Sequence, residues 1–132
     1  MTAYTIYNKE NGEIASTVKC SKDAIEEELK ENQSYIHGDY NDAEYYIDLT
    51  TISPKEKPTI PININKKTLQ ADEKDQIVMS NLPISTRIEV RRTFYHVDDG
   101  IFEFSTDTAG KYDIVCEATN YLPQKIEVEA YD

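Results

Sequence analysis

Residues 71–90 (ADEKDQIVMSNLPISTRIEV) and residues 97–130 (VDDGIFEFSTDTAGKYDIVCEATNYLPQKIEVEA) decide the fold of this chain. Short runs in both stretches alternate apolar and polar residues, and turn-forming groups such as Asn-Leu-Pro, Asp-Asp-Gly and Tyr-Leu-Pro separate them. The runs recur at intervals of about ten residues, the spacing expected of short strands joined by turns. This pattern predicts antiparallel strands, each with one buried and one hydrated face.

Seven strands are predicted between residues 62 and 130, a density typical of an immunoglobulin-like β-sandwich. The predicted strands are residues 62–65, 76–80, 87–92, 94–97, 100–105, 111–118 and 125–130. Alternation then identifies the inward-facing side chains, which are Ile77, Met79, Ile88, Val90, Phe102, Phe104, Tyr112, Ile114, Cys116, Ile126 and Val128. Residues 62–132 are therefore predicted to be an immunoglobulin-like antiparallel β-sandwich.

The first part of the chain, residues 1–52, is predicted to be a small ββαββ module. Asn11 and Gly12 accept the positive φ of a tight hairpin, and Ser21 is a favourable N-cap for a helix. The predicted elements are strands 3–7 and 13–18, helix 22–32, and strands 34–37 and 44–49. Their candidate core is small for an independent domain, which favours docking onto another surface. It consists of Tyr4, Ile6, Ile14, Val18, Ile25, Leu29, Ile36, Tyr46 and Leu49.

Residues 53–61 are predicted to form a proline-rich linker between these two parts. Pro54, Pro58 and Pro61 each lack the backbone N–H that a β-ladder uses, and each biases its neighbours toward extended conformations. The expected architecture is therefore mainly β, with a small α+β module, a short stiff linker and a sandwich.

The net charge of −11 argues against nucleic-acid and membrane partners. Binding a phosphate backbone depends on cations that replace condensed counterions, and an anionic bilayer attracts basic segments. Residues 1–13 (MTAYTIYNKENGE) contain neither the basic nor the apolar region of a signal peptide, and no apolar run approaches the length of a bilayer span. We expect a soluble protein made in the cytoplasm, whose acidic surface provides solubility or steers it toward a basic partner.

The residues that usually carry chemistry are few and scattered. His37 and His96 lie in different predicted parts, with no nucleophile or carboxylate at a recognised spacing, so we expect no enzyme and no catalytic, cofactor or metal site. The acidic loops leave calcium binding as an alternative, although the Asp98-Asp99-Gly100 segment fits a tight hairpin turn better. These loops carry Asp72, Glu73, Asp75, Asp98, Asp99 and Asp107.

Cys20 and Cys116 are the only cysteines, too few for a disulfide framework. We expect both to be buried small hydrophobic side chains in a reducing compartment. A disulfide between them is the alternative.

Tyrosine is the prominent aromatic residue, with ten Tyr, three Phe and no Trp. Tyr combines a large apolar body with a hydroxyl that tolerates water, so it suits strand faces that close against a partner. We predict a docking surface on the N-terminal module made of Tyr4, Tyr7, Tyr35, Tyr45 and Tyr46. Tyr4 is thus a candidate both for the core and for this surface.

Residues 4–20 (YTIYNKENGEIASTVKC) resemble the opening of small structural proteins of tailed bacteriophages. In that family a helix and a tyrosine-bearing strand come next, similar to residues 43–48 (AEYYID), followed by a proline-rich joint. Residues 71–90 and 97–118 resemble the immunoglobulin-like domain that follows in such proteins. One motif departs from the family, because Gly-Leu-Pro-x-Gly-Thr appears here as NLPIST at residues 81–86.

The resemblance implies a virion component of the tail, the tail fibre or the connector region, present in several symmetric copies. Its partners would be other virion proteins and copies of itself, and it would be made in the host cytoplasm before it joins the virion. Two other classes remain open. One is a module that binds a host-surface glycan or protein through the sandwich loops, although the lack of Trp disfavours sugar stacking. The other is a tail-fibre assembly chaperone that is absent from the mature particle.

Overall fold

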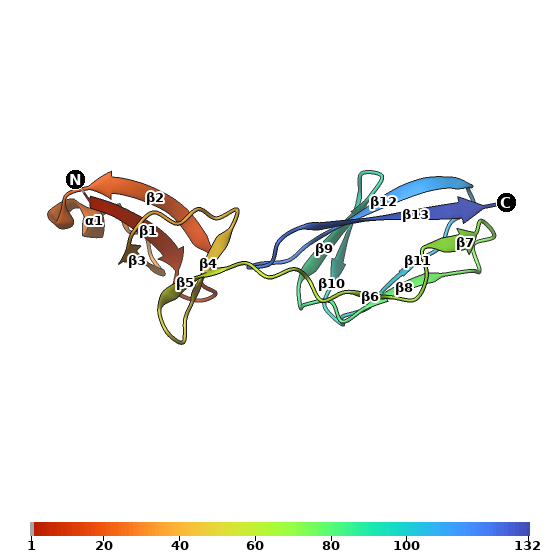
Figure 1. Cartoon of the computed structure of the whole chain (residues 1–132), viewed down its shortest axis with the longest axis horizontal. Helices are drawn as coiled ribbons and strands as arrows, with labels where there is room; N and C mark the ends of the chain where they lie inside the picture. Colours follow the sequence, from red (N-terminus) through yellow and green to blue (C-terminus); the bar gives the residue numbers. More distant parts are fainter. Residues whose placement is uncertain (1) are drawn as a thin grey trace. The chain divides into compact units, whose positions relative to one another are not determined.

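The computed structural model of the protein describes residues 2–132 and divides the chain into two compact units. The N-terminal unit ends at Pro58, and the C-terminal unit extends from Thr59 to Asp132 (Figure 1). Strands dominate the described residues, so the expectation of a mainly β protein is confirmed. Met1, the first residue of the predicted 1–52 module, lies outside the described residues.

The N-terminal unit contains a three-stranded antiparallel sheet in the order β2-β1-β3. β1 (Thr2–Asn8) and β2 (Ile14–Cys20) form a hairpin, and α1 (Lys22–Glu28) leads into β3 (Gln33–His37). β4 (Tyr45–Asp48) follows in sequence but does not join this sheet. The order of the first five elements is therefore β-β-α-β-β, while only three of the four strands share a sheet.

The central strand β1 is covered on both of its faces. Tyr4 and Ile6 pack against Ile25 of α1 on one face, and Tyr7 packs with Ile47 of β4 on the other. None of these side chains is more than 4% exposed. The small unit thus buries its apolar residues in two clusters, one on each side of the sheet.

The helix is shorter than the predicted segment 22–32, because it ends at Glu28. Leu29 leaves helical geometry with φ −78° and ψ 134°, and Asn32 has a positive φ of 65°. Ser21 occupies the N-cap position as expected, but its side chain makes no capping hydrogen bond.

β5 (Ser53–Glu56) lies where the sequence predicted the start of a linker. It pairs antiparallel with β4, and Pro54 stands opposite Ile47. Proline is tolerated there because β5 is an edge strand, with β4 as its one neighbour among the described strands. The prediction of a linker over 53–61 was therefore wrong for residues 53–56, which belong to the N-terminal unit.

Gly12 joins the β1–β2 turn to β4. Its carbonyl oxygen accepts a hydrogen bond of 2.8 Å from the N–H of Ile47. Its φ is +77°, and a Cβ on this residue would overlap the carbonyl oxygen of Ile47. The position therefore needs glycine both for its backbone conformation and for the close approach of two strands.

The C-terminal unit consists of a five-stranded sheet, β10-β9-β12-β13-β7, and a three-stranded sheet, β11-β8-β6. The strands are β6 (Asn63–Ile64), β7 (Thr68–Gln70), β8 (Ile77–Ser80), β9 (Thr86–Val90), β10 (Thr93–Val97), β11 (Phe102–Phe104), β12 (Gly110–Glu117) and β13 (Gln124–Tyr131). Apolar side chains from both sheets form one core, as in a sandwich of two packed layers. Phe104 of one sheet and Tyr112 of the other meet with ring centroids 5.1 Å apart.

The alternation in the sequence identified this core correctly. Ten of the eleven predicted inward-facing residues are buried, and Ile126 is partly buried against the same cluster. Ile77, Met79, Ile88, Ile114 and Cys116 are each 0% exposed.

β7 was not predicted, and it makes the sheet mixed. It pairs parallel with β13, with Thr68 opposite Glu129 and Gln70 opposite Tyr131. Its middle residue, Leu69, is 3% exposed and belongs to the core. The prediction of a wholly antiparallel sandwich was therefore wrong at this edge.

Candidate protein-docking surface

Two of the five tyrosines predicted to form a docking surface are buried. Tyr4 is 1% exposed and Tyr7 is 4% exposed, so both are core residues, and the prediction was wrong for them. Tyr35 packs on the Tyr4 cluster, whereas Tyr45 packs on the Tyr7 cluster. Tyr46 is partly buried like Tyr35 and Tyr45. Alternation along β1 suggested one free face, but elements on both sides cover this strand.

The connection between β10 and β11 is not the hairpin turn predicted at Asp98, Asp99 and Gly100. β10 pairs with β9 and β11 pairs with β8, so the chain crosses here from one sheet to the other. Gly100 has φ +80°, and its carbonyl oxygen accepts the N–H of Leu82 at 3.1 Å. Asp99 Oδ1 accepts the N–H of Ile101 at 3.0 Å. The prediction was wrong because strand pairing is set by distant segments, which the local turn residues do not specify.

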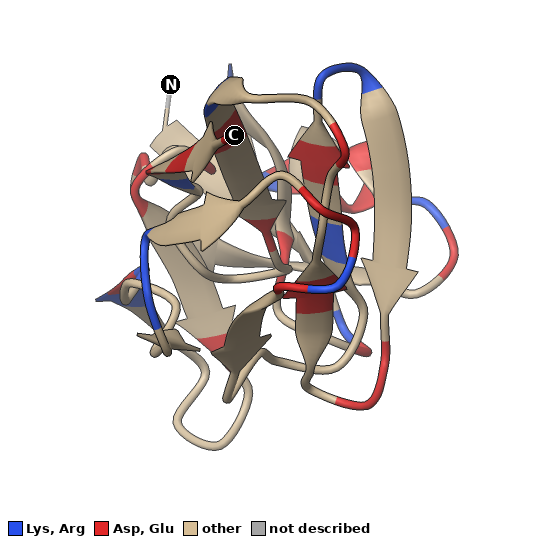
Figure 2. Ribbon diagram, turned by 90° about the vertical axis from the view of Figure 1, so that its right-hand side faces the viewer, with Lys and Arg blue, Asp and Glu red and all other residues tan. Residues whose placement is uncertain are grey.

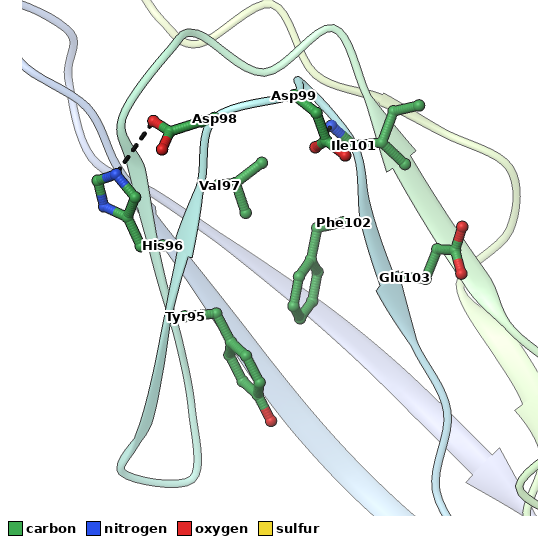
Figure 3. Close-up of a pocket in the computed structure, with 8 residues that line it drawn as sticks. All are labelled: Tyr95, His96, Val97, Asp98, Asp99, Ile101, Phe102 and Glu103. Atoms are coloured by element: carbon green, nitrogen blue, oxygen red, sulfur yellow. Dashed lines mark hydrogen bonds and ion pairs between the residues drawn. The ribbon is translucent and has the colours of Figure 1, made fainter.

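This crossing opens a cleft of about 560 Å³ between the edge strands of the two sheets (Figure 3). Tyr95 projects from β10 toward Phe102 of β11, with ring centroids 5.2 Å apart. Tyr95 is 43% exposed and Ile101 is 47% exposed. The lining residues are Tyr95, His96, Val97, Asp98, Asp99, Ile101, Phe102 and Glu103. Two large apolar side chains, Tyr95 and Ile101, are thus exposed to solvent beside the buried core.

The other face of β10 is also apolar at its surface. Phe94 is 52% exposed, and the Arg87 guanidinium lies over its ring at 4.2 Å from the centroid. Ile84 is 79% exposed in the loop before β9, beside Ser85, whose N–H donates to Asp98 Oδ1 at 3.1 Å. Of the seven exposed large hydrophobic residues in the part of the chain described, four lie on β10 or in loops next to it. Such a concentration of apolar side chains is typical of an interaction site.

Acidic residues lie beside the cleft. The lining residues include Asp98, Asp99 and Glu103, and none is Lys or Arg. Glu103 alternates with the buried Phe102 and Phe104, so its carboxylate points away from the cleft (Figure 3). His96 Nε2 lies 3.0 Å from Asp98 Oδ1. The whole chain has 25 acidic against 14 basic residues, and Figure 2 shows acidic residues on both strands and loops. The cleft therefore combines exposed apolar side chains with the acidic residues of the β10–β11 connection.

The alternative of calcium binding gains no site from the structure. Within residues 2–132, no three His, Cys, Asp or Glu side chains come together in a way that would hold a metal ion. Asp72 Oδ1 instead accepts the N–H groups of Asp75 and Lys74, and these hydrogen bonds lower the pKa of the Asp72 carboxyl. Asp75 is paired with Lys66, which lowers its pKa in turn. These carboxylates serve to organise the turn.

The two cysteines are free thiols in different units. Cys116 is 0% exposed, and burial raises its pKa to about 11. Cys20 is only partly buried, which departs from the expectation that both are buried.

The histidines lie apart as expected. His37 is exposed in the N-terminal unit, where its ring centroid lies 5.1 Å from that of Tyr4. His96 is exposed in the C-terminal unit beside Asp98. No helix among residues 2–132 is long and apolar enough to cross a membrane.

Comparison with known proteins assigns this chain to no family. No family model matches the chain, and no curated protein matches it. Among solved structures, the chain is similar to a glycosyl hydrolase family 2 member from Bacteroides cellulosilyticus, with a TM-score of 0.41 and 8% identity. The similarity covers 99% of this chain and 22% of that chain. At this TM-score, it carries no argument about fold or function.

The sequence pattern did not predict the cleft. Phe94, Tyr95 and Val97 were assigned to a strand, and exposed apolar residues look like core residues in an alternating pattern. The exposure of Phe94 and Tyr95 follows from the position of β10 at the edge of its sheet. The one available signal was the run of three aromatic residues, Phe94, Tyr95 and His96, which places large rings on both faces of one strand.

Proposed function

We propose that this chain is a non-enzymatic structural subunit of a tailed-bacteriophage particle, in the tail, the tail fibre or the connector region. It works through protein–protein assembly, with other virion proteins and further copies of itself as partners, and it binds neither nucleic acid nor membrane. It is made in the host cytoplasm and is incorporated into the virion. The observation that carries the assembly role is the open edge of the C-terminal unit, where Tyr95, Ile101 and Phe94 remain exposed. The phage assignment rests on the sequence resemblance of residues 4–20, 71–90 and 97–118.

We further propose that the C-terminal unit is an immunoglobulin-like sandwich. The strand orders β6-β8-β11 and β13-β12-β9-β10 support this assignment, because they correspond to the A-B-E and G-F-C-C′ orders of such domains. A second support is Tyr112 near the start of β12, whose hydroxyl donates to the carbonyl oxygen of Thr108 at 2.6 Å. This is the geometry of a tyrosine corner, which these sandwiches use between their fifth and sixth strands.

The departure from the family motif at residues 81–86 is compatible with the same backbone path. Asn81 and Ser85 stand where the family has glycine, and their φ angles are +63° and +62°. Positive φ is the conformation that glycine adopts most easily, so the family's glycines and this chain's turn require the same geometry. Asn tolerates that conformation well, whereas Ser adopts it at a cost.

The test is mass spectrometry of purified phage particles whose genome encodes this chain. A structural subunit is expected in those particles in several copies per virion, and it should co-purify with tail proteins after the particles are dissociated. A chain that is abundant in the infected cell but missing from the particles would overturn the structural role, and it would favour the assembly chaperone instead.

A further inference from the structure

We propose that the cleft between β10 and β11 binds an extended segment of another protein, which adds to β10 as a strand and alternates apolar with basic side chains. This inference deepens the proposed function and rests on its assembly role, because it names the surface and the chemistry of the partner segment. Three features of the structure support it: a free strand edge, a cleft with exposed apolar side chains beside that edge, and a carboxylate next to the edge on the outer face of the sheet.

β10 has a free edge that is suited to strand addition. Within residues 2–132 it pairs only with β9, through a hairpin whose two loop residues are Arg91 and Arg92. A two-residue loop makes Thr93 the first hydrogen-bonded residue of β10. Alternation then directs the N–H and C=O groups of Phe94 and His96 away from β9. These groups are available to the backbone of an incoming strand.

The cleft gives such a strand a place for apolar side chains. Tyr95 stands opposite Ile88, which is 0% exposed, so Tyr95 lies on the inner face of its sheet. Alternate side chains of a strand added beside β10 would therefore enter the space lined by Tyr95, Ile101 and Phe102 (Figure 3). In this mode of recognition the backbone supplies affinity, and pockets for alternate side chains supply specificity.

The charge beside the free edge identifies the occupant. The side chains of an added strand that alternate with the apolar ones lie on the outer face of the sheet, next to the carboxylate of Asp98, which contacts His96 there. Basic side chains at these positions gain a favourable contact, and the net charge of −11 adds to it. A second copy of this chain is a poor occupant, because each copy has a net charge of −11 and β10 itself (TFYHV) has no Lys or Arg. We therefore assign the cleft to a basic segment of a different protein.

The first experiment measures peptide binding to the full chain by NMR. The probe is a blocked peptide of seven residues that alternates lysine with valine, and two control peptides alternate glutamate with valine and lysine with serine. Only the first peptide should shift the backbone amides of Phe94 and His96 and slow their hydrogen exchange. Equal binding of the glutamate peptide, or shifts confined to other surfaces, would overturn the proposal.

The second experiment uses variants of the edge and of the side chains beside it. His96→Pro removes one free N–H without breaking a bond to β9, and it should abolish peptide binding while the rest of the amide spectrum stays intact. Tyr95→Ser removes an apolar wall and serves in its place if the proline variant does not fold. Asp98→Asn, which keeps a side-chain oxygen to accept the N–H of Ser85, should weaken binding roughly two- to fivefold, as expected for one exposed ion pair, whereas Glu127→Gln on β13 should not. Unchanged binding by folded His96→Pro or Tyr95→Ser would overturn the proposal.

Two further outcomes separate the choice of partner from the proposed function. Sedimentation of the protein alone should show no self-association through β10, and a dimer that His96→Pro dissociates would overturn the assignment to a basic partner. Peptide binding by a chain that is absent from phage particles would overturn only the proposed virion role. A particle subunit that fails to bind the lysine–valine peptide would overturn only this inference.

Discussion

The hydroxyl of Tyr112 donates a hydrogen bond of 2.6 Å to the backbone carbonyl of Thr108, four residues before it. The same hydroxyl lies 2.9 Å from Thr106 Oγ1, and the Arg91 guanidinium covers the ring at 4.0 Å from its centroid. The ring itself is 5% exposed and packs on Phe104. One side chain therefore fastens the loop between β11 and β12 to the core of the sandwich.

Tyr112→Phe should lower the free energy of unfolding of the C-terminal unit by about 1–3 kcal/mol, because a partly buried carbonyl loses its partner. Amide hydrogen exchange of β12 in the full chain measures this change. Tyr131→Phe is the matched control, because its hydroxyl bonds to Glu129 at the surface. The control should change stability by no more than about 0.5 kcal/mol. Equal effects of the two variants would contradict the role assigned to Tyr112.

Ser85→Gly should stabilise the C-terminal unit by about 0.5–1 kcal/mol. Ser85 has φ +62°, which disfavours a residue with a Cβ, whereas glycine adopts this conformation freely. Ser85→Ala is the control, since it removes the weak contact of Ser85 Oγ with Asp98 at 3.3 Å and keeps the strain. Thermal unfolding followed by circular dichroism distinguishes the two variants. A melting temperature of Ser85→Gly below that of the natural chain would contradict the view that Ser85 is strained.

Gly12→Ala should destabilise the N-terminal unit by more than about 3 kcal/mol, because backbone strain adds to a steric overlap with Ile47. Hydrogen exchange of the amide of Ile6 reports on this unit. Gly100→Ala gives the comparison, since Gly100 has φ +80° but its nearest neighbour to an added Cβ is 3.4 Å away. Gly100→Ala should lower the free energy of unfolding of the C-terminal unit by only about 1–2 kcal/mol, because it adds backbone strain without a steric overlap. A milder effect at Gly12 than at Gly100 would mean that β4 moves easily.

Alkaline pH should weaken the C-terminal unit through Cys116. Burial raises the pKa of this thiol from 9.0 to about 11, so the folded state favours the protonated form. That contribution is complete below pH 9 and is lost as the pH rises toward 11. Urea unfolding at pH 8 and pH 10.5 should show a larger loss of stability for the natural chain than for Cys116→Val. Parallel losses in the two proteins would exclude a role for the thiol.

The core of the C-terminal unit could be predicted because its signal is local. Ile77 and Met79, or Ile114 and Cys116, alternate with polar neighbours, and one buried face per strand is enough to produce that pattern. β7 escaped prediction because Thr68–Gln70 supplies three residues with one apolar side chain, too short to show any period. Its pairing with β13 depends on residues about 60 positions away, which no local pattern describes.

The predictions were wrong where segments distant in the sequence pair with a strand or cover it. Pro54 suggested a linker, yet an edge strand accepts proline once β4 offers it a partner. Tyr7 alternates like a surface tyrosine, yet Ile47 arrives from a later strand to cover it. The opposite holds for Tyr95. Its side chain lies on the inner face of the sheet but remains exposed, because no strand of residues 2–132 pairs with the second edge of β10.

The parallel pairing of β7 with β13 has a mechanical consequence. Thr68 and Gln70 run in the same direction as Glu129 and Tyr131, so the start of β7 and the end of β13 lie at opposite ends of the ladder. Tension that pulls these two ends apart loads the ladder along its length, and its hydrogen bonds have to rupture together instead of peeling open one by one. A protein built in this way withstands stretching along its strands better than its few β7 contacts suggest.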